Sequence, residues 1–129
     1  MQTDSTEPTG ELTIRTMAMP ADTNAAGDIF GGWVMSQMDI AGAVAAVERV
    51  KGRVATVAVE AMTFIAPVKV GDVLCVYTTI DRIGNTSITV ALEAWVRRSE
   101  LPHRRKVTEG RFVYVALDEN GSKRRIGPA

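Results

Sequence analysis

Hydrophobic and polar residues alternate along most of this 129-residue chain, which is the pattern of half-buried β-strands. The clearest alternation places Ile88, Val90 and Leu92 on one face, and the other runs are rich in β-branched residues. Turn residues such as Gly84-Asn85 and Leu101-Pro102 separate the runs. The pattern predicts one short strand and, after a gap, four long strands in succession. The expected strands cover residues 11–17, 53–66, 73–83, 86–98 and 106–117.

One segment lacks this two-residue period. From Gly31 to Val47 the residues are small or apolar all the way round, and Asp39 is the single charged side chain. A helix of this composition is typically enclosed by protein. A loop with turn chemistry, residues 19–32, precedes it, and Lys51-Gly52 provides a basic residue and a glycine at its end. We therefore expect one buried α-helix between the first two strands.

The order of strand, helix and four strands predicts an α+β fold in which a long antiparallel sheet wraps one central helix over its whole circumference. The domain should span residues 11–118, between a flexible segment at 1–10 and a polar tail at 119–129. Such a sheet still leaves its outer face and one long edge uncovered. Pairing with a second copy would cover them, so we expect a homo-oligomer.

Composition and charge argue against several classes of function. Fifteen basic and fifteen acidic residues cancel, so no net field attracts nucleic acid or a membrane surface. The single cysteine, Cys75, allows no internal disulfide or thiolate metal site, and we expect it to be a buried filler. Residues 1–10 lack the apolar core of a signal peptide, and the apolar helix is too short for a membrane span. We expect a cytoplasmic protein.

The leading candidate for chemistry is Asp39. A carboxylate in the middle of an enclosed helix is costly unless it is paired or used. Of the residues one turn away, only Ser36 can form a hydrogen bond, and no Lys or Arg lies within a turn. The sequence therefore keeps an expensive group without local compensation.

Other common catalytic devices are missing from the sequence. It has no Gly-x-Ser-x-Gly elbow, metal-ligand cluster, Walker loop or dinucleotide fingerprint, and its only histidine, His103, lies in a basic hairpin segment. We therefore expect chemistry without a metal or an organic cofactor. What remains is a carboxylate acting as general base or nucleophile, with the first helix amides at Gly31 and Gly32 to polarise a carbonyl oxygen.

The spacing of these groups sets a condition on the site. Asp39 follows Gly32 by seven residues, so the two lie ~10 Å apart along one helix. The amides and the carboxylate of one helix cannot reach the same carbonyl. If both act in one reaction, they come from two antiparallel helices at a two-fold subunit interface, and the dimer is the minimal unit.

Three segments carry a resemblance to a known family. Residues 15–39 read RTMAMPADTNAAGDIFGGWVMSQMD, residues 56–72 read TVAVEAMTFIAPVKVGD, and residues 93–96 read EAWV. Together they closely resemble bacterial acyl-CoA thioesterases of the YciA type, in the hotdog-fold superfamily. The resemblance extends over about residues 12–118, which is nearly the whole chain.

This resemblance implies the hotdog fold, hydrolysis of acyl-CoA to free CoA and a carboxylic acid, and a hexamer that is a trimer of dimers. It places the catalytic carboxylate at Asp39, Asn24 in a loop that contributes to the site, and the oxyanion-type amides at Gly31 and Gly32. Burial and charge alone had indicated the same Asp39. The chain differs from many relatives at Ala61, where they carry a serine hydroxyl.

Binding of CoA has two sets of candidates. The turn of Gly84, Asn85, Thr86 and Ser87 offers amides and hydroxyls to the pantetheine or phosphate end. Charge-assisted contacts to the phosphates could come from basic runs, which are otherwise solvated hairpin tips. These runs are Arg97-Arg98, His103 to Lys106 and Lys123 to Arg125. The favoured residues are Arg104, Arg105 and Lys106 of the second run.

Plain structural alternatives remain for several residues. Asn24 could serve only an Asx turn, and Asp28 has the position of an N-cap or first-turn carboxylate. The double glycine could simply let two backbones approach. Two rival functions also stay open, namely a non-catalytic acyl-CoA-binding module on the same fold and a thioesterase acting on acyl carrier protein.

Overall fold

The computed structural model describes residues 7–128. In chain order its elements are β1 (Glu11–Met17), the short 3₁₀ helix η1 (Pro20–Asp22), α1 (Gly31–Val50), β2 (Val54–Phe64), β3 (Val73–Ile83), β4 (Ser87–Arg97) and β5 (Arg105–Ala116). Every predicted strand is present close to its expected bounds, and so is the helix. The 3₁₀ helix lies in the segment that was expected to be a loop.

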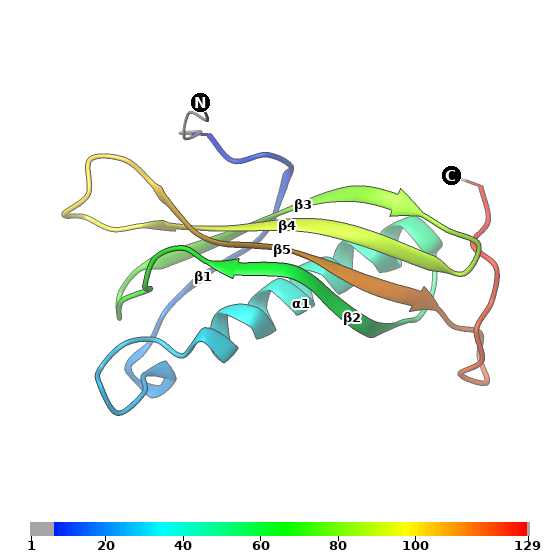
Figure 1. Ribbon diagram of the computed structural model, residues 1–129, viewed down its shortest axis with the longest axis horizontal. Helices are drawn as coiled ribbons and strands as arrows, with labels where there is room; N and C mark the ends of the chain where they lie inside the picture. The colour runs from blue at the N-terminus through cyan, green and yellow to red at the C-terminus, as the bar shows by residue number, and fades with distance from the viewer. Residues whose placement is uncertain (1–6, 129) are drawn as a thin grey trace.

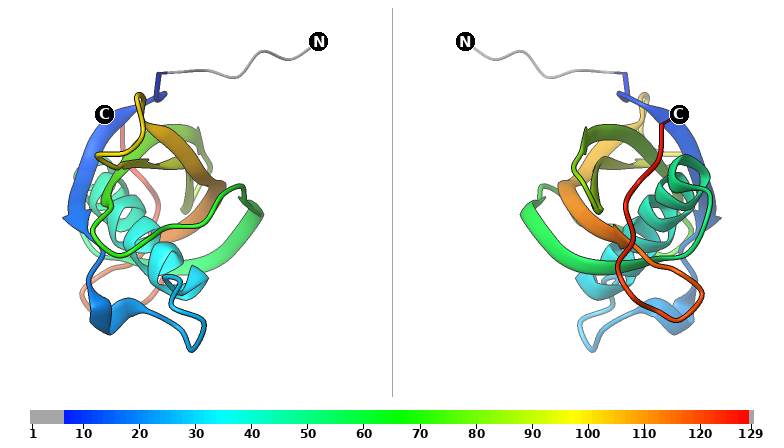
Figure 2. Two further views of the ribbon diagram at one scale, coloured as in Figure 1. Left: turned by 90° about the vertical axis from the view of Figure 1, so that its left-hand side faces the viewer. Right: turned by 90° about the vertical axis from the view of Figure 1, so that its right-hand side faces the viewer.

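The five strands form one antiparallel sheet in the order β1-β3-β4-β5-β2. Strands β3, β4 and β5 are neighbours in sequence and in space, whereas β2 pairs with the far side of β5. The sheet is strongly curved, and α1 lies along its concave side (Figures 1 and 2). The predicted α+β architecture, a long antiparallel sheet wrapped around one helix, is confirmed.

The main core lies between α1 and the concave face of the sheet. Helix residues Val34, Met38 and Ala41 are buried there, and the alternation predicted for β4 is confirmed because Ile88 and Val90 are fully buried. A second, smaller cluster on the sheet contains Cys75, Tyr77 and Trp95. Cys75 is 1% exposed, so the prediction of a buried filler is also confirmed.

The expectation that the sheet covers the whole circumference of the helix is wrong. One side of α1 is open in the single chain, where Ile40, Val44 and Val47 are 51%, 43% and 42% exposed. The curved sheet reaches only the side of the helix that faces its concave surface. An exposed apolar face of this kind marks a contact with another molecule. Within residues 7–128, no helix is long and apolar enough to cross a membrane.

The edge strand β2 is irregular and exposes further apolar side chains. Its pairing with β5 shifts register between Thr56 and Ala58 and again between Glu60 and Thr63. Ala61, at the second shift, has a φ of 50°, which is a left-handed backbone conformation. Irregularities of this kind bend and twist a strand, and here they accompany the curvature of β2 around α1.

Candidate functional site

The Asp39 carboxylate lies near the middle of α1 and is half-buried beside β2 and β5. Its Oδ1 accepts a hydrogen bond from Thr56 Oγ1 at 2.7 Å and one from the Tyr114 hydroxyl at 3.0 Å. The same Tyr114 hydroxyl is also 3.0 Å from the Asp39 carbonyl oxygen. Among the described residues nothing hydrogen-bonds to Oδ2. Two hydroxyls therefore hold one carboxylate oxygen while the other stays available.

The compensation for this charge comes from the sheet. Ser36, the one polar neighbour on the helix, donates its hydroxyl to the Trp33 carbonyl at 2.7 Å instead of to Asp39. No ion pair within residues 7–128 includes Asp39. Burial, followed by the negative charge of Asp39, raises the pKa of Tyr114 far above its usual value, so its hydroxyl stays protonated as a donor. Asp39 is thus oriented by neutral donors and is not neutralised by a cation.

Gly42 makes the contact between Tyr114 and the helix possible. A Cβ at this position would collide with the Tyr114 hydroxyl and lie 2.9 Å from its ring carbon Cζ. Sequence reasoning missed both Gly42 and Tyr114 as parts of the site. The available signal was a glycine inside a helical pattern, which usually marks a close packing contact.

The N-terminus of α1 is open. Phe30 is the N-cap and provides no side-chain hydrogen bond. In the described part of the chain, the amides of Gly31 and Gly32 have no acceptor, and both residues are exposed. A Cβ at Gly31 would lie 3.2 Å from the Phe64 ring, whereas one at Gly32 would meet nothing within 4 Å. The predicted pair of unpaired helix amides is therefore present.

Asp28 does not cap this helix, so that expectation is wrong. Its carboxylate instead forms an ion pair with Lys69, with 2.7 Å between Oδ1 and Nζ. The lysine reaches Asp28 from the loop that follows β2, and the pair joins the two loops next to the start of α1. Both side chains are about half exposed, so this contact is worth little in stability.

Asn24 forms the Asx turn that was one of its two interpretations. Its Oδ1 accepts hydrogen bonds from the amides of Ala26 at 2.9 Å and Asp28 at 3.1 Å. These bonds shape the loop that leads into α1. No acceptor for the Asn24 side-chain NH₂ lies within residues 7–128, so the turn uses only one end of the amide. A role in the reaction stays a prediction.

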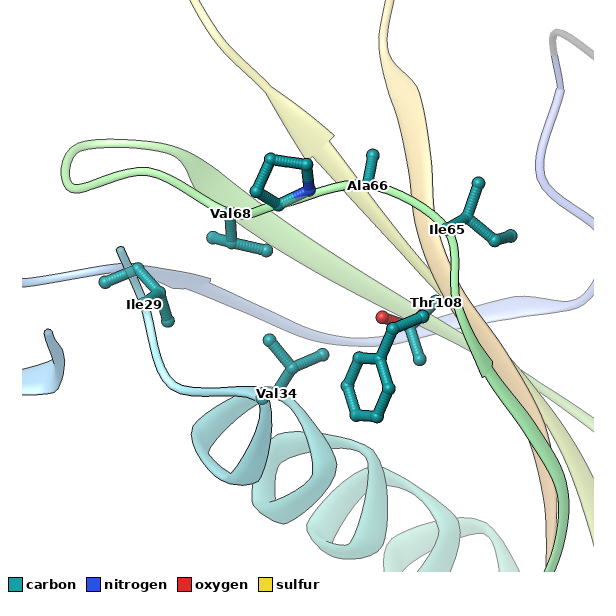
Figure 3. Close-up of a pocket in the computed structure, with 9 residues that line it drawn as sticks. Ile29, Val34, Ile65, Ala66, Val68 and Thr108 are labelled. Atoms are coloured by element: carbon teal, nitrogen blue, oxygen red, sulfur yellow. The ribbon is translucent and has the colours of Figure 1, made fainter. Parts of the chain in front are cut away.

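A cavity opens beside the start of the helix. It has a volume of about 320 Å³, and Gly31 and Val34 of α1 form part of its wall. Figure 3 shows Val68 on one side of it and Thr108 of β5 on another. The other lining residues are Ile29, Phe64, Ile65, Ala66 and Pro67. The cavity is therefore mainly apolar and adjoins the unpaired helix amides.

The basic residues of the β4–β5 hairpin lie at the same end of the molecule. They line a second hollow of about 430 Å³, which includes Arg97, Arg98, His103 and Arg104. Arg104 donates to the Tyr77 hydroxyl at 3.2 Å and faces Glu7 at 3.4 Å. Three arginines, Arg97, Arg98 and Arg104, therefore line this hollow.

The three favoured basic residues differ in their surroundings. Arg105 is exposed and has no charged partner among the described residues. Lys106 is 2.6 Å from Glu109 and 3.7 Å from Glu93. Although burial lowers the pKa of Lys106, contacts with Glu109 and Glu93 outweigh it and raise the pKa overall. Of the three, Lys106 is the least available to a phosphate.

The turn of residues 84–87 lies at the opposite end of the sheet from this hairpin (Figure 1). The eleven residues of β3 separate the two ends by ~35 Å, much more than the length of a nucleotide. Asn85 is occupied by the C-terminal segment, because its carbonyl accepts from Ile126 at 2.9 Å and its Oδ1 from Arg125 at 3.1 Å. One chain therefore does not bring the two candidate binding segments together.

Arg124, in the third basic run, has a structural contact. Its guanidinium donates to the Val50 carbonyl at 2.7 Å and to the Leu117 carbonyl at 3.1 Å. Val50 is the last residue of α1, so Arg124 satisfies a carbonyl at the helix C-terminus.

Sequence reasoning also missed a buried ion pair behind the basic hairpin. Arg98 makes two hydrogen bonds of 2.7 Å to the carboxylate of Asp72, which is 1% exposed. This contact raises the pKa of Arg98. The Lys69 amide also donates to the same carboxylate, at 2.9 Å. Arg98 is therefore part of the scaffold that joins the hairpin to the loop before β3.

No group of three His, Cys, Asp or Glu side chains within residues 7–128 is placed to hold a metal ion. The chemical features of the site are a carboxylate with one oxygen available, a pair of open helix amides and an apolar cavity beside those amides. A general base or nucleophile, oxyanion-type amides and an apolar cavity are the groups that acyl transfer to water requires.

Comparisons with known proteins agree with this chemistry. The family model for the thioesterase superfamily matches residues 26–115. The acyl-CoA thioester hydrolase YciA of Salmonella typhimurium is 54% identical over 98% of this chain and 97% of its own length. The hexameric thioesterase y2039 from Yersinia pestis is 53% identical, with a TM-score of 0.91 over 95% of this chain and 100% of that one.

Two further solved structures extend the agreement. The hexameric broad-specificity acyl-coenzyme A thioesterase HI0827 is 50% identical and has a TM-score of 0.89, over 95% of this chain and 84% of that one. A hexameric hotdog-fold thioesterase of Campylobacter jejuni is 40% identical, with a TM-score of 0.87 over 92% of this chain and 91% of that one. The predicted family and fold are both confirmed: this chain belongs to the thioesterase superfamily and has the hotdog fold of the YciA-type enzymes.

Proposed function

We propose that this protein hydrolyses acyl-CoA thioesters to free CoA and a carboxylic acid, without a metal or an organic cofactor. The observation that carries the proposal is the Asp39 carboxylate, which Thr56 and Tyr114 orient through Oδ1 while Oδ2 stays available. The activities named for the 54% and 50% identical relatives support the same reaction. The cytoplasm stays the predicted compartment.

In the first route Asp39 acts as a general base. Its Oδ2 takes a proton from water, and the resulting hydroxide attacks the thioester carbonyl carbon. The carbonyl oxygen becomes an oxyanion and accepts hydrogen bonds from helix amides at Gly31 and Gly32. The carbon–sulfur bond then breaks, and the thiolate of CoA takes the proton back from Asp39.

In the second route the Asp39 oxygen itself attacks the carbonyl carbon. The carbon–sulfur bond breaks and CoA leaves as a thiolate. Water then hydrolyses the mixed anhydride, which releases the acid, regenerates the carboxylate and frees the proton that the thiolate takes up. Thr56 and Tyr114 have the same task in both routes, since they orient the carboxylate without removing its charge. Asn24, whose NH₂ faces no acceptor in the described residues, is proposed to contribute to the same site from the loop before α1.

The site is proposed to form between two copies of the chain. Because α1 is continuous from Gly31 to Val50, Asp39 and Gly32 of one chain stay ~10 Å apart. The helix start of a second copy can reach the carboxylate if the two helices lie side by side and antiparallel. The apolar face with Ile40 and Val44 is available for this contact. We infer a dimer as the minimal unit and, from the hexameric relatives, a trimer of dimers.

The nucleotide end of CoA is proposed to bind at the β4–β5 hairpin. Arg104 and Arg105 supply positive charge beside the hollow at that end. In each chain, the turn Gly84 to Ser87 lies far from the β4–β5 hairpin. The turn therefore stays a candidate only for a CoA site that is formed by two chains.

Release of free thiol from acyl-CoAs with two to sixteen acyl carbons tests the proposal. We expect turnover with at least part of this series and a preferred length set by the cavity. The same acyl group on acyl carrier protein should react more slowly. Binding of acyl-CoA without thiol release would instead favour a non-catalytic binding module, and faster reaction on the carrier protein would favour the carrier-protein thioesterase.

A further inference from the structure

Thr108 carries an unusual side chain. It lies on β5 and is 1% exposed, and its Oγ1 is the one buried side-chain oxygen or nitrogen within residues 7–128 that has no hydrogen-bond partner. An unpaired buried hydroxyl destabilises a fold, because the group loses its contact with water and gains nothing in return. Such an atom calls for an explanation, and a ligand group is one.

This hydroxyl belongs to the wall of the cavity beside the helix start. Figure 3 shows the Thr108 oxygen turned toward the side on which Val34 and Val68 lie. The other side chains of the wall are apolar, so Thr108 is its single side-chain hydrogen-bonding group. The backbone of Gly31, whose amide has no acceptor among the described residues, lines the same space.

We propose that this cavity takes the acyl group and that Thr108 determines specificity by hydrogen-bonding an oxygen atom on the acyl chain. The inference rests on the proposed thioester hydrolysis. The occupant follows from the geometry, because the helix amides that would hold the thioester carbonyl adjoin a mainly apolar chamber. The single hydroxyl then lies beside the chain that extends from this carbonyl.

A hydroxyl can both donate and accept, so Thr108 can pair with a hydroxyl or with a keto oxygen. A hydrocarbon chain of the same length would leave Oγ1 unpaired in the complex. Sites with a buried polar group reject analogues that lack the matching oxygen more strongly than apolar pockets reject an extra methylene. The cavity should therefore prefer oxygen-bearing acyl groups over plain ones.

The experiment compares kcat/KM for butyryl-CoA with its 3-hydroxy and 3-oxo forms. We expect at least one oxygenated substrate to be preferred by on the order of tenfold or more, and Thr108→Val to lower that ratio about tenfold. Thr108→Ser keeps a hydroxyl and should preserve the preference. Thr108→Ala removes the hydroxyl without a branched replacement and gives a second measurement if the valine variant folds poorly.

The possible failures are distinguishable. If the wild-type enzyme releases thiol but Thr108→Val and Thr108→Ala leave the ratio unchanged, the role of Thr108 is wrong and the hydrolase assignment stands. Equal rates on plain and oxygenated substrates in the wild type would overturn the inference in the same way. If no acyl-CoA in the series releases thiol, both the inference and the proposed function are wrong.

Discussion

At the scale of single residues, the proposed reaction depends on Asp39 keeping its negative charge. A cation beside a carboxylate would form an ion pair with it, whereas hydroxyl donors orient the carboxylate without cancelling its charge. Thr56 and Tyr114 are donors of this kind, and both bind Oδ1. Oδ2 is therefore the atom expected to meet water or the thioester carbon.

Asp39→Asn should reduce kcat about 10²–10⁴-fold, because an amide has nearly the same shape but cannot take a proton or attack the carbonyl. Thermal unfolding and oligomer size should stay close to those of the wild type. Asp81→Asn, a matched change at an exposed carboxylate on β3, should keep full activity. Turnover of Asp39→Asn within about threefold of the parent would remove Asp39 from the mechanism.

At the scale of elements, α1 contains a residue that intrinsic helix propensity disfavours but that packing against the sheet requires. Alanine is a better helix former than glycine by about 1 kcal/mol, yet Gly42 is the position where Tyr114 reaches the helix backbone. The packing of β5 on α1 therefore overrides the local preference.

Gly42→Ala should lower the free energy of unfolding by about 1–3 kcal/mol, because the added methyl displaces the Tyr114 ring. Activity should fall as well, since the displaced hydroxyl no longer holds Asp39. Gly32→Ala is the matched control, because a Cβ there meets nothing within 4 Å. Denaturant unfolding of the two variants checks this, and equal stability would contradict the contact.

The sequence was sufficient to predict the helix and the strands, and it singled out Asp39 as the candidate carboxylate. Alternation and β-branched runs located the strands, and the helix was found because its composition differed from everything around it. The partners of Asp39 were out of reach, since Thr56 and Tyr114 come from strands whose pairing with the helix depends on the curvature of the sheet. The buried ion pair of Asp72 and Arg98 was also missed, because 26 residues separate them in sequence and only the fold brings them together.

The hairpin between β4 and β5 should act on the nucleotide end of the substrate. The double variant Arg104→Gln and Arg105→Gln should raise KM for acyl-CoA on the order of tenfold with kcat nearly unchanged, since phosphate anchoring is uniform binding. The effect should shrink with added salt and vanish for acyl-pantetheine, which lacks the nucleotide phosphates.

A control at the other end of the sheet sharpens this measurement. Lys51→Gln with Arg53→Gln removes the same charge from exposed positions just beyond the C-terminal end of α1, outside all of the candidate CoA-binding segments. If this control raises KM as strongly as the hairpin variant, general charge attraction would explain the effect. An equal loss by the hairpin variant on acyl-pantetheine would show that Arg104 and Arg105 only support the fold.

At the scale of the whole molecule, the single chain is incomplete in two respects. Its helix leaves an apolar side open, with Ile40 51% exposed, and β2 forms a free sheet edge with Val57 54% exposed. In addition, the Asp39 carboxylate and the open helix amides of one chain lie too far apart to contact the same carbonyl group. A second copy placed against this helix would resolve both.

Mixing two inactive variants tests this composite site most directly. One carries Asp39→Asn, and the other carries Gly32→Pro, which removes one amide hydrogen but suits the first turn of a helix. In a mixed dimer, one site combines an intact Asp39 with an intact Gly32, and the other site has neither. After subunit exchange, verified with distinguishable tags, thiol release should recover to about a quarter of the wild-type rate, because half of random pairs are mixed. If mixed dimers form and stay inactive while re-exchanged wild type is active, the site does not combine Asp39 of one chain with the helix start of another.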